Sequence, residues 1–218
     1  RLSRAFITKQ GASGKEQAPG TADNAVYAPN GSPEQGTSKY GTSLFMYSIS
    51  APTLLLSYHE LKFLEAEALC RLGRDAKSAL KDAVVAGLLN AESSFSVSRK
   101  ELGKDLINPA ASITEAEAES YFDNTVEAKY TAEPLKTTMT QKYFALWGAS
   151  GEATESYNDV RRMKGLGENF IELKNPNSFP LRCPYGNSDT TTNAEVKAAY
   201  GNGQYVYSEN VWWAGGSR

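Results

Sequence analysis

Residues 57–90, SYHELKFLEAEALCRLGRDAKSALKDAVVAGLLN, carry the clearest structural pattern in the chain. Ser57 followed by Glu60 predicts a capping box. In it the Ser57 hydroxyl accepts a hydrogen bond from the Glu60 amide, and the Glu60 carboxylate accepts one from the Ser57 amide. Gly73 is placed to end this first helix in the left-handed conformation, and Asp75 is placed to cap a second one. The segment therefore predicts a helical hairpin.

Both helices of the hairpin show an apolar stripe at helical spacing. The stripe of the first consists of Leu61, Leu64, Ala68 and Leu72, with Ala66 and Leu69 beside them. The stripe of the second consists of Ala76, Ala79, Leu80, Ala83, Val84, Gly87 and Leu88. We expect Leu64 and Leu80 to be buried, facing each other or a shared neighbour. His59 is expected at the first turn, partly exposed to solvent.

The hairpin spans 34 residues, which is the length of a tetratricopeptide unit. One such unit cannot bury its own faces, and about three are needed for a stable stack. No clean second copy occurs in the sequence, so the other units are either irregular or lie upstream of Arg1. In the second case, an exposed apolar patch above ~600 Å² is expected on the outer face of the hairpin.

Further helices are expected between residues 112 and 165. Thr114 with Glu117 predicts a second capping box, and Pro134 suits the first position of another helix. This helix is expected to end at Gly148, with Tyr143 and Trp147 packed in the core. A last helical segment is expected over residues 152–163.

The whole chain divides into three parts by composition. Residues 1–56 are loop-rich, residues 57–165 are helical and contain the hairpin, and residues 166–218 form a loop-rich C-terminal wrap. The predicted fold class is mainly α: a tetratricopeptide-like hairpin and further helices, wrapped by long irregular loops, with few or no strands.

Composition excludes several functional classes. The 218 residues include 23 Lys and Arg against 25 Asp and Glu, a net charge of −2 without the basic excess of a nucleic-acid binder. No apolar run approaches the ~20 residues of a membrane helix. The chain opens on Arg1, with no signal peptide in view, so either processing removed one or the chain is a piece of a longer protein.

The sequence offers little catalytic or metal-binding chemistry. It has one histidine, two cysteines and no nucleophile, metal or phosphate-loop motif, so we expect no catalytic residue, no cofactor and no metal. The polar run 187–193 contains calcium-type oxygens but lacks the acidic density of a calcium loop, and a polar turn is expected there. The 25 acidic residues provide many possible carboxylate pairs, so a glycoside hydrolase stays open as a further functional hypothesis.

Aromatic side chains provide the most usable binding chemistry. Tyr27 and Tyr40 lie in a Gly- and Ser-rich segment where no apolar period requires them, so they are the candidate ligand-binding residues. The opposing interpretation is that this segment is a disordered surface excursion. Trp212 and Trp213, near the C-terminus, are expected to anchor the tail on the helices.

Several ordered blocks of the sequence resemble one family. Residues 54–68, LLLSYHELKFLEAEA, are similar to the LLTYAEVKFLEAEA block of the SusD-like (SusD/RagB) proteins, and residues 141–148, QKYFALWG, to their QKYIALWG. Residues 155–162, ESYNDVRR, residues 180–185, PLRCPY, and the closing residues 211–213, VWW, also resemble family blocks. The departures at Gly186, Asp189 and Ala214 all lie in the C-terminal loop.

SusD-like proteins are outer-membrane nutrient-binding lipoproteins of Bacteroidetes, and the blocks resemble their C-terminal half. The resemblance implies non-catalytic capture of an oligosaccharide or polysaccharide at the cell surface and its transfer to a SusC-like TonB-dependent transporter. It also implies membrane attachment only through an N-terminal lipid anchor that this chain does not contain. The alternative function is that of a protein–protein scaffold, a helical domain that docks the transporter without binding sugar itself.

Overall fold

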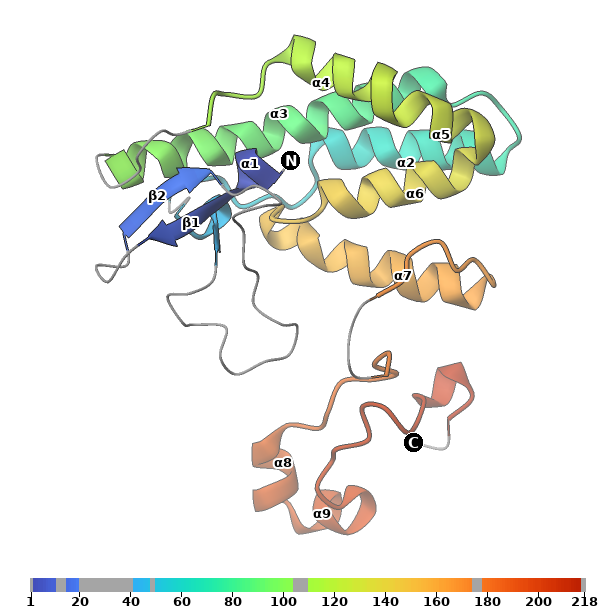
Figure 1. Cartoon of the computed structure of the whole chain (residues 1–218). Helices are drawn as coiled ribbons and strands as arrows, with labels where there is room; N and C mark the ends of the chain where they lie inside the picture. Colours follow the sequence, from blue (N-terminus) through green and yellow to red (C-terminus); the bar gives the residue numbers. More distant parts are fainter. Residues whose placement is uncertain are drawn as a thin grey trace. The chain divides into compact units, whose positions relative to one another are not determined.

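A computed structural model describes residues 2–10, 15–19, 41–47, 50–103, 110–173 and 178–216. The chain forms two compact units, Arg1–Glu172 and Leu173–Arg218, which are described separately (Figure 1). Most described residues of the first unit are helical, which confirms the mainly α fold class. Within the described residues, no helix is both long and apolar enough to cross a membrane.

The hairpin consists of α2 (Tyr58–Arg71) and α3 (Lys77–Leu102). The Ser57 hydroxyl accepts the Glu60 amide at 3.2 Å, the first of the two capping-box contacts expected. Gly73 adopts a φ of +67° after α2, as predicted. The N-cap of α3 is Ala76 rather than the expected Asp75, whose carboxylate accepts the Lys77 amide at 3.0 Å. The second helix continues well beyond its expected end at residue 90, because no helix-breaking residue intervenes before Gly103.

The main core lies where α2 and α3 pack against the helices that follow. Leu80 is fully buried in it, as predicted. The core residues are Phe63, Ala66, Ala76, Ala79, Leu80, Ala83, Val84, Phe122, Val126 and Tyr130. Alanines at successive turns of α3 let the helices approach closely, and the Tyr130 hydroxyl donates to Asp75 at 3.0 Å, tying this core to the loop of the hairpin.

The expected buried stripe of α2 is wrong. Leu61, Leu64 and Leu72 are 53%, 41% and 67% exposed, and Ala68 is exposed as well. The helix turns its other side inward, where Phe63 and Ala66 are fully buried. This second apolar face contains the bulkier phenyl ring, and it is the one that packs against α3 and α6.

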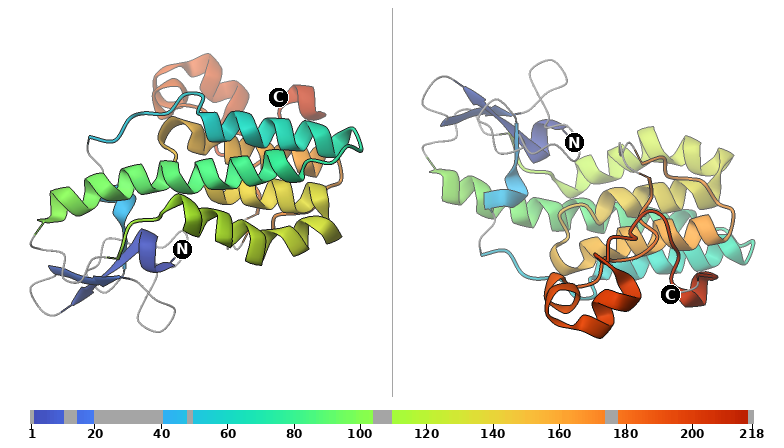
Figure 2. Two further views of the ribbon diagram at one scale, coloured as in Figure 1. Left: turned by 90° about the horizontal axis from the view of Figure 1, so that it is seen from above. Right: turned by 90° about the horizontal axis from the view of Figure 1, so that it is seen from below.

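Four further helical elements complete the helical part of this unit. These are α4 (Glu115–Tyr121), α5 (Glu127–Ala132), α6 (Pro134–Ala145) and α7 (Glu155–Gly165). A π-helical turn, η4 (Phe122–Val126), joins α4 to α5, and a 3-10 turn, η5 (Ser150–Thr154), precedes α7. The capping box at Thr114 and the helix start at Pro134 are confirmed. In the left view of Figure 2, α3 runs between α2 and the α4–α5 pair.

A small antiparallel sheet lies near the far end of α3. It consists of β1 (Phe6–Gln10), β2 (Lys15–Pro19) and β3 (Thr42–Ser43) in the order β2-β1-β3, flanked by α1 (Leu2–Ala5) and by the 3-10 turn η2 (Leu44–Tyr47). A second, smaller core joins this region to α3, and its buried members are Ala5, Ile7, Leu44 and Phe95. The Ser98 hydroxyl of α3 donates to the Leu44 carbonyl.

The C-terminal unit contains α8 (Asn187–Thr192), α9 (Ala194–Tyr200) and the 3-10 turn η6 (Trp212–Ala214). The polar turn expected over residues 187–193 is therefore a helix. Its threonine hydroxyls donate to backbone carbonyls one turn earlier, and Asn193 caps α9. Across all the described residues, no group of three His, Cys, Asp or Glu is arranged to hold a metal ion.

Candidate ligand-binding surface

An aromatic cluster forms where α6 ends beside the sheet. The indole of Trp147 stacks on Phe6 with ring centres 5.2 Å apart, and it meets Phe45 edge-on at 5.0 Å. Trp147 and Phe144 are each 46% exposed, so the expected core position of Trp147 is wrong. The reason is local: α6 ends at Ala145, and the helical spacing that places Trp147 on the buried face no longer applies beyond it.

Gly148 makes this arrangement possible. Its φ of +78° is left-handed, and a Cβ atom there would lie 2.4 Å from the ring of Phe45. Only glycine combines that backbone conformation with so close an approach. Gly148 therefore allows Phe45 of η2 to pack against the indole of Trp147.

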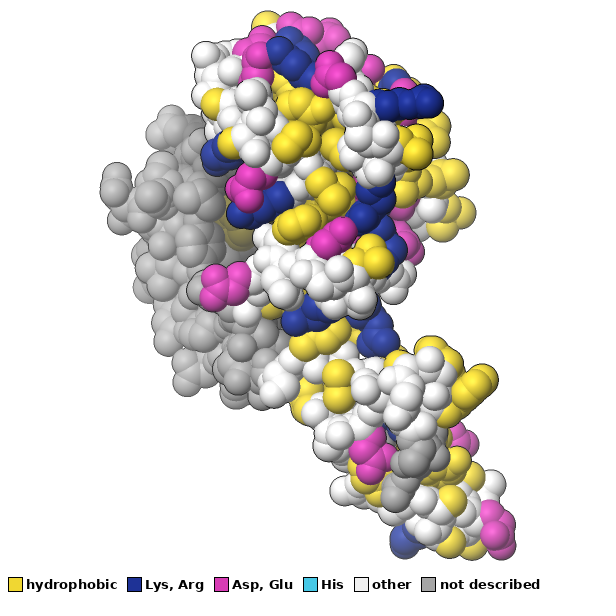
Figure 3. Space-filling view, turned by 90° about the vertical axis from the view of Figure 1, so that its right-hand side faces the viewer, with side chains coloured by type: hydrophobic (Ala, Val, Ile, Leu, Met, Phe, Trp, Pro, Cys, Tyr) yellow, Lys and Arg dark blue, Asp and Glu magenta, His cyan; other side chains and the backbone are white. Residues whose placement is uncertain are grey.

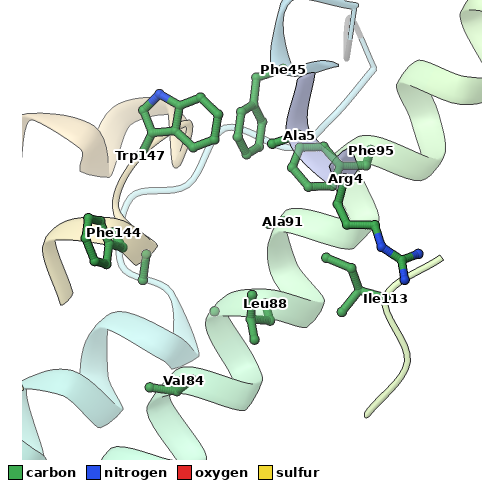
Figure 4. A pocket seen from close by; sticks show the side chains of 12 residues that line it. Arg4, Ala5, Phe45, Val84, Leu88, Ala91, Phe95, Ile113, Phe144 and Trp147 are labelled. Carbon is green, nitrogen blue, oxygen red and sulfur yellow. The ribbon is translucent and has the colours of Figure 1, made fainter. Parts of the chain in front are cut away.

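A small apolar pocket of about 50 Å³ lies beside the cluster (Figure 4). In Figure 4, Trp147 and Phe45 lie next to each other at one end of the pocket, and Leu88 and Val84 of α3 at the other. The lining consists of Arg4, Ala5, Phe45, Val84, Gly87, Leu88, Ala91, Phe95, Ile113, Phe144, Ala145 and Trp147. The pocket thus presents apolar and aromatic surface to any ligand.

Arg4 contributes the only charged side chain of that lining. Its guanidinium donates to the Glu117 carboxylate at 2.9 Å and to the Ser112 carbonyl at 3.3 Å, and it also contacts the Ala111 carbonyl. These contacts hold α1 against the start of α4. The arginine is therefore a clamp between the sheet region and the helices.

The exposed side of Trp147 borders a second, more open hollow. This hollow is lined by Ala5, Phe6, Tyr143, Phe144, Leu146, Trp147, Gly148, Ala153 and Ser156. Tyr143 and Ser156 are the members of this lining that carry hydroxyl groups, and that of Ser156 donates to the Ala153 carbonyl at 2.7 Å. Flat rings next to a few polar groups suit a ligand with both apolar faces and hydroxyl edges.

Tyr27 and Tyr40, the predicted ligand-binding residues, lie outside the described residues, so their role stays a prediction. The described strands show where their segment is attached. It leaves the sheet after Pro19 of β2 and rejoins it before Thr42 of β3. Thr42 pairs with Ile7, the residue after Phe6, so the attachment point is next to the aromatic cluster.

A buried polar cluster under the start of α2 was not expected. His59 is only 2% exposed, which contradicts its expected partial exposure. Its Nδ1 lies 2.8 Å from the Ser57 hydroxyl and its Nε2 lies 3.8 Å from the Glu152 carboxylate. Burial lowers the pKa of His59, and the nearby Glu152 charge raises it only in part. The imidazole is therefore neutral at neutral pH.

Glu60 and Lys142 are two more buried ionisable side chains of this cluster. Both carboxylate oxygens of Glu152 are buried without a hydrogen-bond partner among the described residues. Burial, together with the charge of Glu152, raises the pKa of Glu60, although Lys142 opposes the shift. Lys142 is itself buried and pairs with Asp159 at 2.8 Å. The cluster joins α2, α6 and α7 through charges enclosed in the helix packing.

No family model and no curated protein matches the chain. Among solved structures, the chain is similar to a SusD/RagB family protein from Bacteroides thetaiotaomicron, with 65% sequence identity over 100% of this chain and a TM-score of 0.88. The chain spans about half of that protein, 47% of its length.

The chain belongs to the SusD/RagB family. The resemblance seen in the sequence blocks is thus confirmed for a partial chain of the family. One of these blocks, residues 141–148, contributes Phe144, Trp147 and Gly148 to the aromatic cluster, whereas Phe6 and Phe45 lie outside it.

A second SusD/RagB block, residues 155–162, lies on α7. Its Arg162 pairs with Glu67 of α2 at 2.5 and 2.8 Å. Arg71 also donates to Glu67, at 2.7 Å, and to Glu168. Burial raises the pKa of Glu67, but the hydrogen bonds from the two arginines outweigh it, so the pKa lies below its ordinary value.

Two other arginines of the family blocks have local contacts. Arg161 donates to the Tyr157 hydroxyl at 3.1 Å, one turn away. Arg182 lies over the ring of Tyr185 within the C-terminal unit, 4.9 Å from its centre. On the face seen in Figure 3, charged side chains of both signs alternate with apolar ones on the helical unit. The Glu67–Arg162 pair thus holds α2 and α7 together.

Proposed function

We propose that this SusD/RagB chain is part of a non-catalytic protein that captures a glycan or similar nutrient. In this proposal the full protein is held at the cell surface by an N-terminal lipid anchor on the outer membrane. It passes its ligand to a SusC-like TonB-dependent transporter. The observation that carries the binding role is the half-exposed aromatic surface of Trp147 and Phe144 beside the sheet.

The physical basis is the shape of sugars. Their C–H faces are flat and apolar and their edges carry hydroxyls, so aromatic planes with nearby polar groups fit them. Trp147 offers such a plane at the open hollow, where Tyr143 and Ser156 add polar edges. Tyr27 and Tyr40, on the segment between β2 and β3, are proposed to add the stacking contacts that hold the ligand.

The absence of catalysis is also part of the proposal. The single histidine is enclosed by the helices and lies against the hydroxyl that caps α2. Glu152, which is close enough to Glu60 to raise its pKa, is fully buried, so this pair does not face across an open cleft as the carboxylates of a glycosidase do. Products released from a polysaccharide panel, and lost on acid-residue substitution, would contradict this part.

The binding proposal is tested in the full-length protein that contains this chain. A glycan array first identifies a bound sugar, and titration calorimetry then measures its affinity for the double variant Tyr27→Ala with Tyr40→Ala. Two stacking contacts of ~1 kcal/mol each predict a loss of about tenfold or more. The matched control is Tyr58→Ala, which removes an exposed tyrosine from α2.

Two results are decisive for the site. If the double variant binds normally while the parent binds the same sugar, the tyrosines are not the site. If affinity falls equally in the Tyr58→Ala control, the loss comes from general damage, and the assignment to residues 27 and 40 fails.

The second candidate function is a helical scaffold that docks the transporter and binds no sugar. The specific observation in its favour is the exposed apolar face of α2, formed by Leu61, Leu64 and Leu72. A full-length protein that binds the transporter but no member of a broad glycan panel would support this alternative.

A further inference from the structure

The turn η5 contains a buried carboxyl group that lacks a hydrogen-bond donor. The side chain of Glu152 is fully buried, and neither of its carboxylate oxygens has a hydrogen-bond partner among the described residues. A buried carboxylate without a donor is unfavourable, because it has lost its hydration and gained no hydrogen bond in return. A neighbour of Glu152 must therefore supply a proton.

His59 does not meet this need. Its Nδ1 lies 2.8 Å from the Ser57 hydroxyl, which accepts the Glu60 amide and can donate its own proton to Nδ1. The neutral imidazole then carries its N–H at Nε2, which lies 3.8 Å from the Glu152 carboxylate. This distance is too long for a hydrogen bond, so the histidine provides neither a charge nor a direct donor.

Glu60 of α2 is the side chain that can supply the proton. Burial raises the pKa of Glu60, and both the charge of Glu152 and a hydrogen bond to Glu152 act in the same direction. Two ionised carboxylates cannot form such a bond, because both only accept, whereas a protonated carboxyl donates. One proton on Glu60 thus gives Glu152 its missing donor.

The cations around this pair are engaged with other carboxylates. Lys142 opposes the rise in the pKa of Glu60, but it pairs with Asp159 at 2.8 Å, as Arg162 does. Glu155 adds a negative charge that raises the pKa of Glu60 further. Besides His59, the charged groups facing Glu60 are Glu67 and Arg71 of α2, Lys142 of α6, Glu152 of η5, and Glu155, Asp159 and Arg162 of α7.

The backbone of η5 packs directly against the segment that leads into α2. A Cβ atom at Gly151 would lie 2.7 Å from the Leu54 carbonyl oxygen, so the two backbones are in close contact. Ser150 has a φ of +53°, in the left-handed region that residues other than glycine seldom adopt. A turn with such a backbone keeps its shape only while its surroundings hold it, and the Glu60–Glu152 contact is part of those surroundings.

The same turn forms part of the wall of the open hollow at Trp147. Ala153 of η5 and Ser156 of α7 line this hollow together with Trp147 and Gly148. Because η5 begins two residues after Gly148, a displacement of the turn moves one wall of the hollow.

We propose that Glu60 and Glu152 share one proton and form a pH-sensitive latch, which holds η5 and the adjoining wall of the hollow against α2. When the pH rises, the proton passes to solvent, the two neighbouring carboxylates repel each other, and η5 is released. The latch concerns the conformation of this turn, so it stands or fails independently of whether the hollow binds a sugar.

The latch weakens as the pH rises. The pKa of Glu60 is higher in the folded protein than its ordinary value of 4.5, so the closed turn holds a proton that the released turn gives up. The stabilisation is fully present below about pH 4.5 and is lost as the pH rises through the folded value. Titration of His59 acts in the opposite direction, because a lowered pKa makes the folded form more stable as the pH rises.

Hydrogen exchange in the full-length protein tests the latch. Peptide mass spectrometry follows the amides of residues 149–156 from about pH 5 to about pH 9, the range in which buried glutamates titrate. The wild type is compared with Glu60→Gln, whose amide still donates to Glu152 but does not titrate. Glu65→Gln is the matched control, since it makes the same substitution at an exposed position of α2. Rates are compared at the same pH, so the intrinsic exchange chemistry cancels.

We expect residues 149–156 of the wild type and of Glu65→Gln to exchange faster than those of Glu60→Gln as the pH rises. The ratio should grow by up to about tenfold per pH unit until the folded pKa of Glu60 is passed. Equal rates in the wild type and Glu60→Gln across the range overturn the latch. A ratio that grows as the pH falls assigns the titration to His59 and overturns it as well.

Infrared difference spectroscopy provides a second measurement that does not depend on the opening of η5. Over the same pH range, the wild type should show one buried protonated carboxyl group that titrates. This signal should be absent from both Glu60→Gln and Glu152→Gln, because each substitution removes one of the two partners. A signal that persists in either variant means that the proton is not shared by this pair, and the proposal fails.

Discussion

The two faces of α2 have similar apolar patterns, but one face is buried and the other is exposed to solvent. Phe63 and Ala66 are fully buried on the inner face, whereas Leu61 and Leu72 are more than half exposed on the outer face. Both faces repeat at helical spacing, and the outer one contains more leucines. The pattern of apolar residues therefore indicates that a face is built to pack, but it does not indicate whether its partner lies within the chain.

The strongest way to test this difference is to truncate the packed face. Phe63→Ala removes a fully buried ring from between α2, α3 and α6. We expect the free energy of unfolding of the 218-residue chain to fall by about 3–5 kcal/mol, as for other buried phenylalanines. Urea unfolding followed by circular dichroism measures the change. A loss below about 1 kcal/mol would mean that the inner face is not packed as described.

Much of the fold was predictable because it depends on local chemistry. Gly73, Thr114 and Pro134 mark helix ends through backbone constraints that act within a few residues, and all three are confirmed. The inner face of α2 was missed because four aliphatic positions outweighed one phenylalanine in the pattern. Which of two apolar faces is buried depends on α6, more than 60 residues later in the chain.

Two glycines provide a second comparison of packed and open positions. A Cβ atom at Gly148 would overlap the ring of Phe45, whereas a Cβ atom at Gly73 has no atom within 4 Å. Both residues have positive φ, so alanine costs about 1–2 kcal/mol at either position. We expect Gly148→Ala to cost about 2–4 kcal/mol in total, because overpacking adds to the backbone strain.

The measurement for these variants is again urea unfolding, with near-ultraviolet circular dichroism as a probe of the Trp147 environment. Gly148→Ala should change the tryptophan signal, since Phe45 must move away from the indole. Gly73→Ala should leave that signal unchanged. An equal loss of stability in both variants would show that the close approach of Phe45 contributes nothing.

Acid unfolding tests the charged contacts between α2 and α7. The pKa of Glu67 is lower in the folded protein than in the unfolded chain, so the unfolded chain binds more protons as the pH falls. The stabilisation from Glu67 is thus present above its ordinary pKa of about 4.5 and is lost as the pH falls through the lower folded value. Glu67→Gln should reduce the slope of stability against pH in this range, below about pH 4.5.

The partner residue gives the matching measurement. Arg162→Gln removes two of the hydrogen bonds that lower the pKa of Glu67, so it should reduce the same slope. The unfolding free energy of both variants is measured between about pH 3 and pH 6, because carboxylates titrate in this range. An unchanged slope in both would mean that Glu67 titrates alike in the folded and unfolded chains.

The candidate site was less predictable than the fold. The aromatic cluster combines Phe6, Phe45 and Trp147 from three separate elements, and no local spacing brings them together. The buried pair of His59 and Glu152 likewise joins residues far apart in sequence. A local signal existed only for His59, which shares the helical period of Phe63, Ala66 and Cys70 on the inner face of α2.

The smallest expected effect is on the open face. Leu64→Ala in the 218-residue chain should change the unfolding free energy by less than about 1 kcal/mol, since the side chain is 41% exposed and alanine is as good a helix former as leucine. The same substitution in the full-length protein should cost about 2–5 kcal/mol if a neighbouring helix covers the stripe. The loss of unfolding free energy is therefore expected to differ between the 218-residue chain and the full-length protein. Equal small losses in both proteins would mean that the outer leucines lack an intramolecular neighbour, whereas a large loss in the 218-residue chain would contradict the exposure of this face.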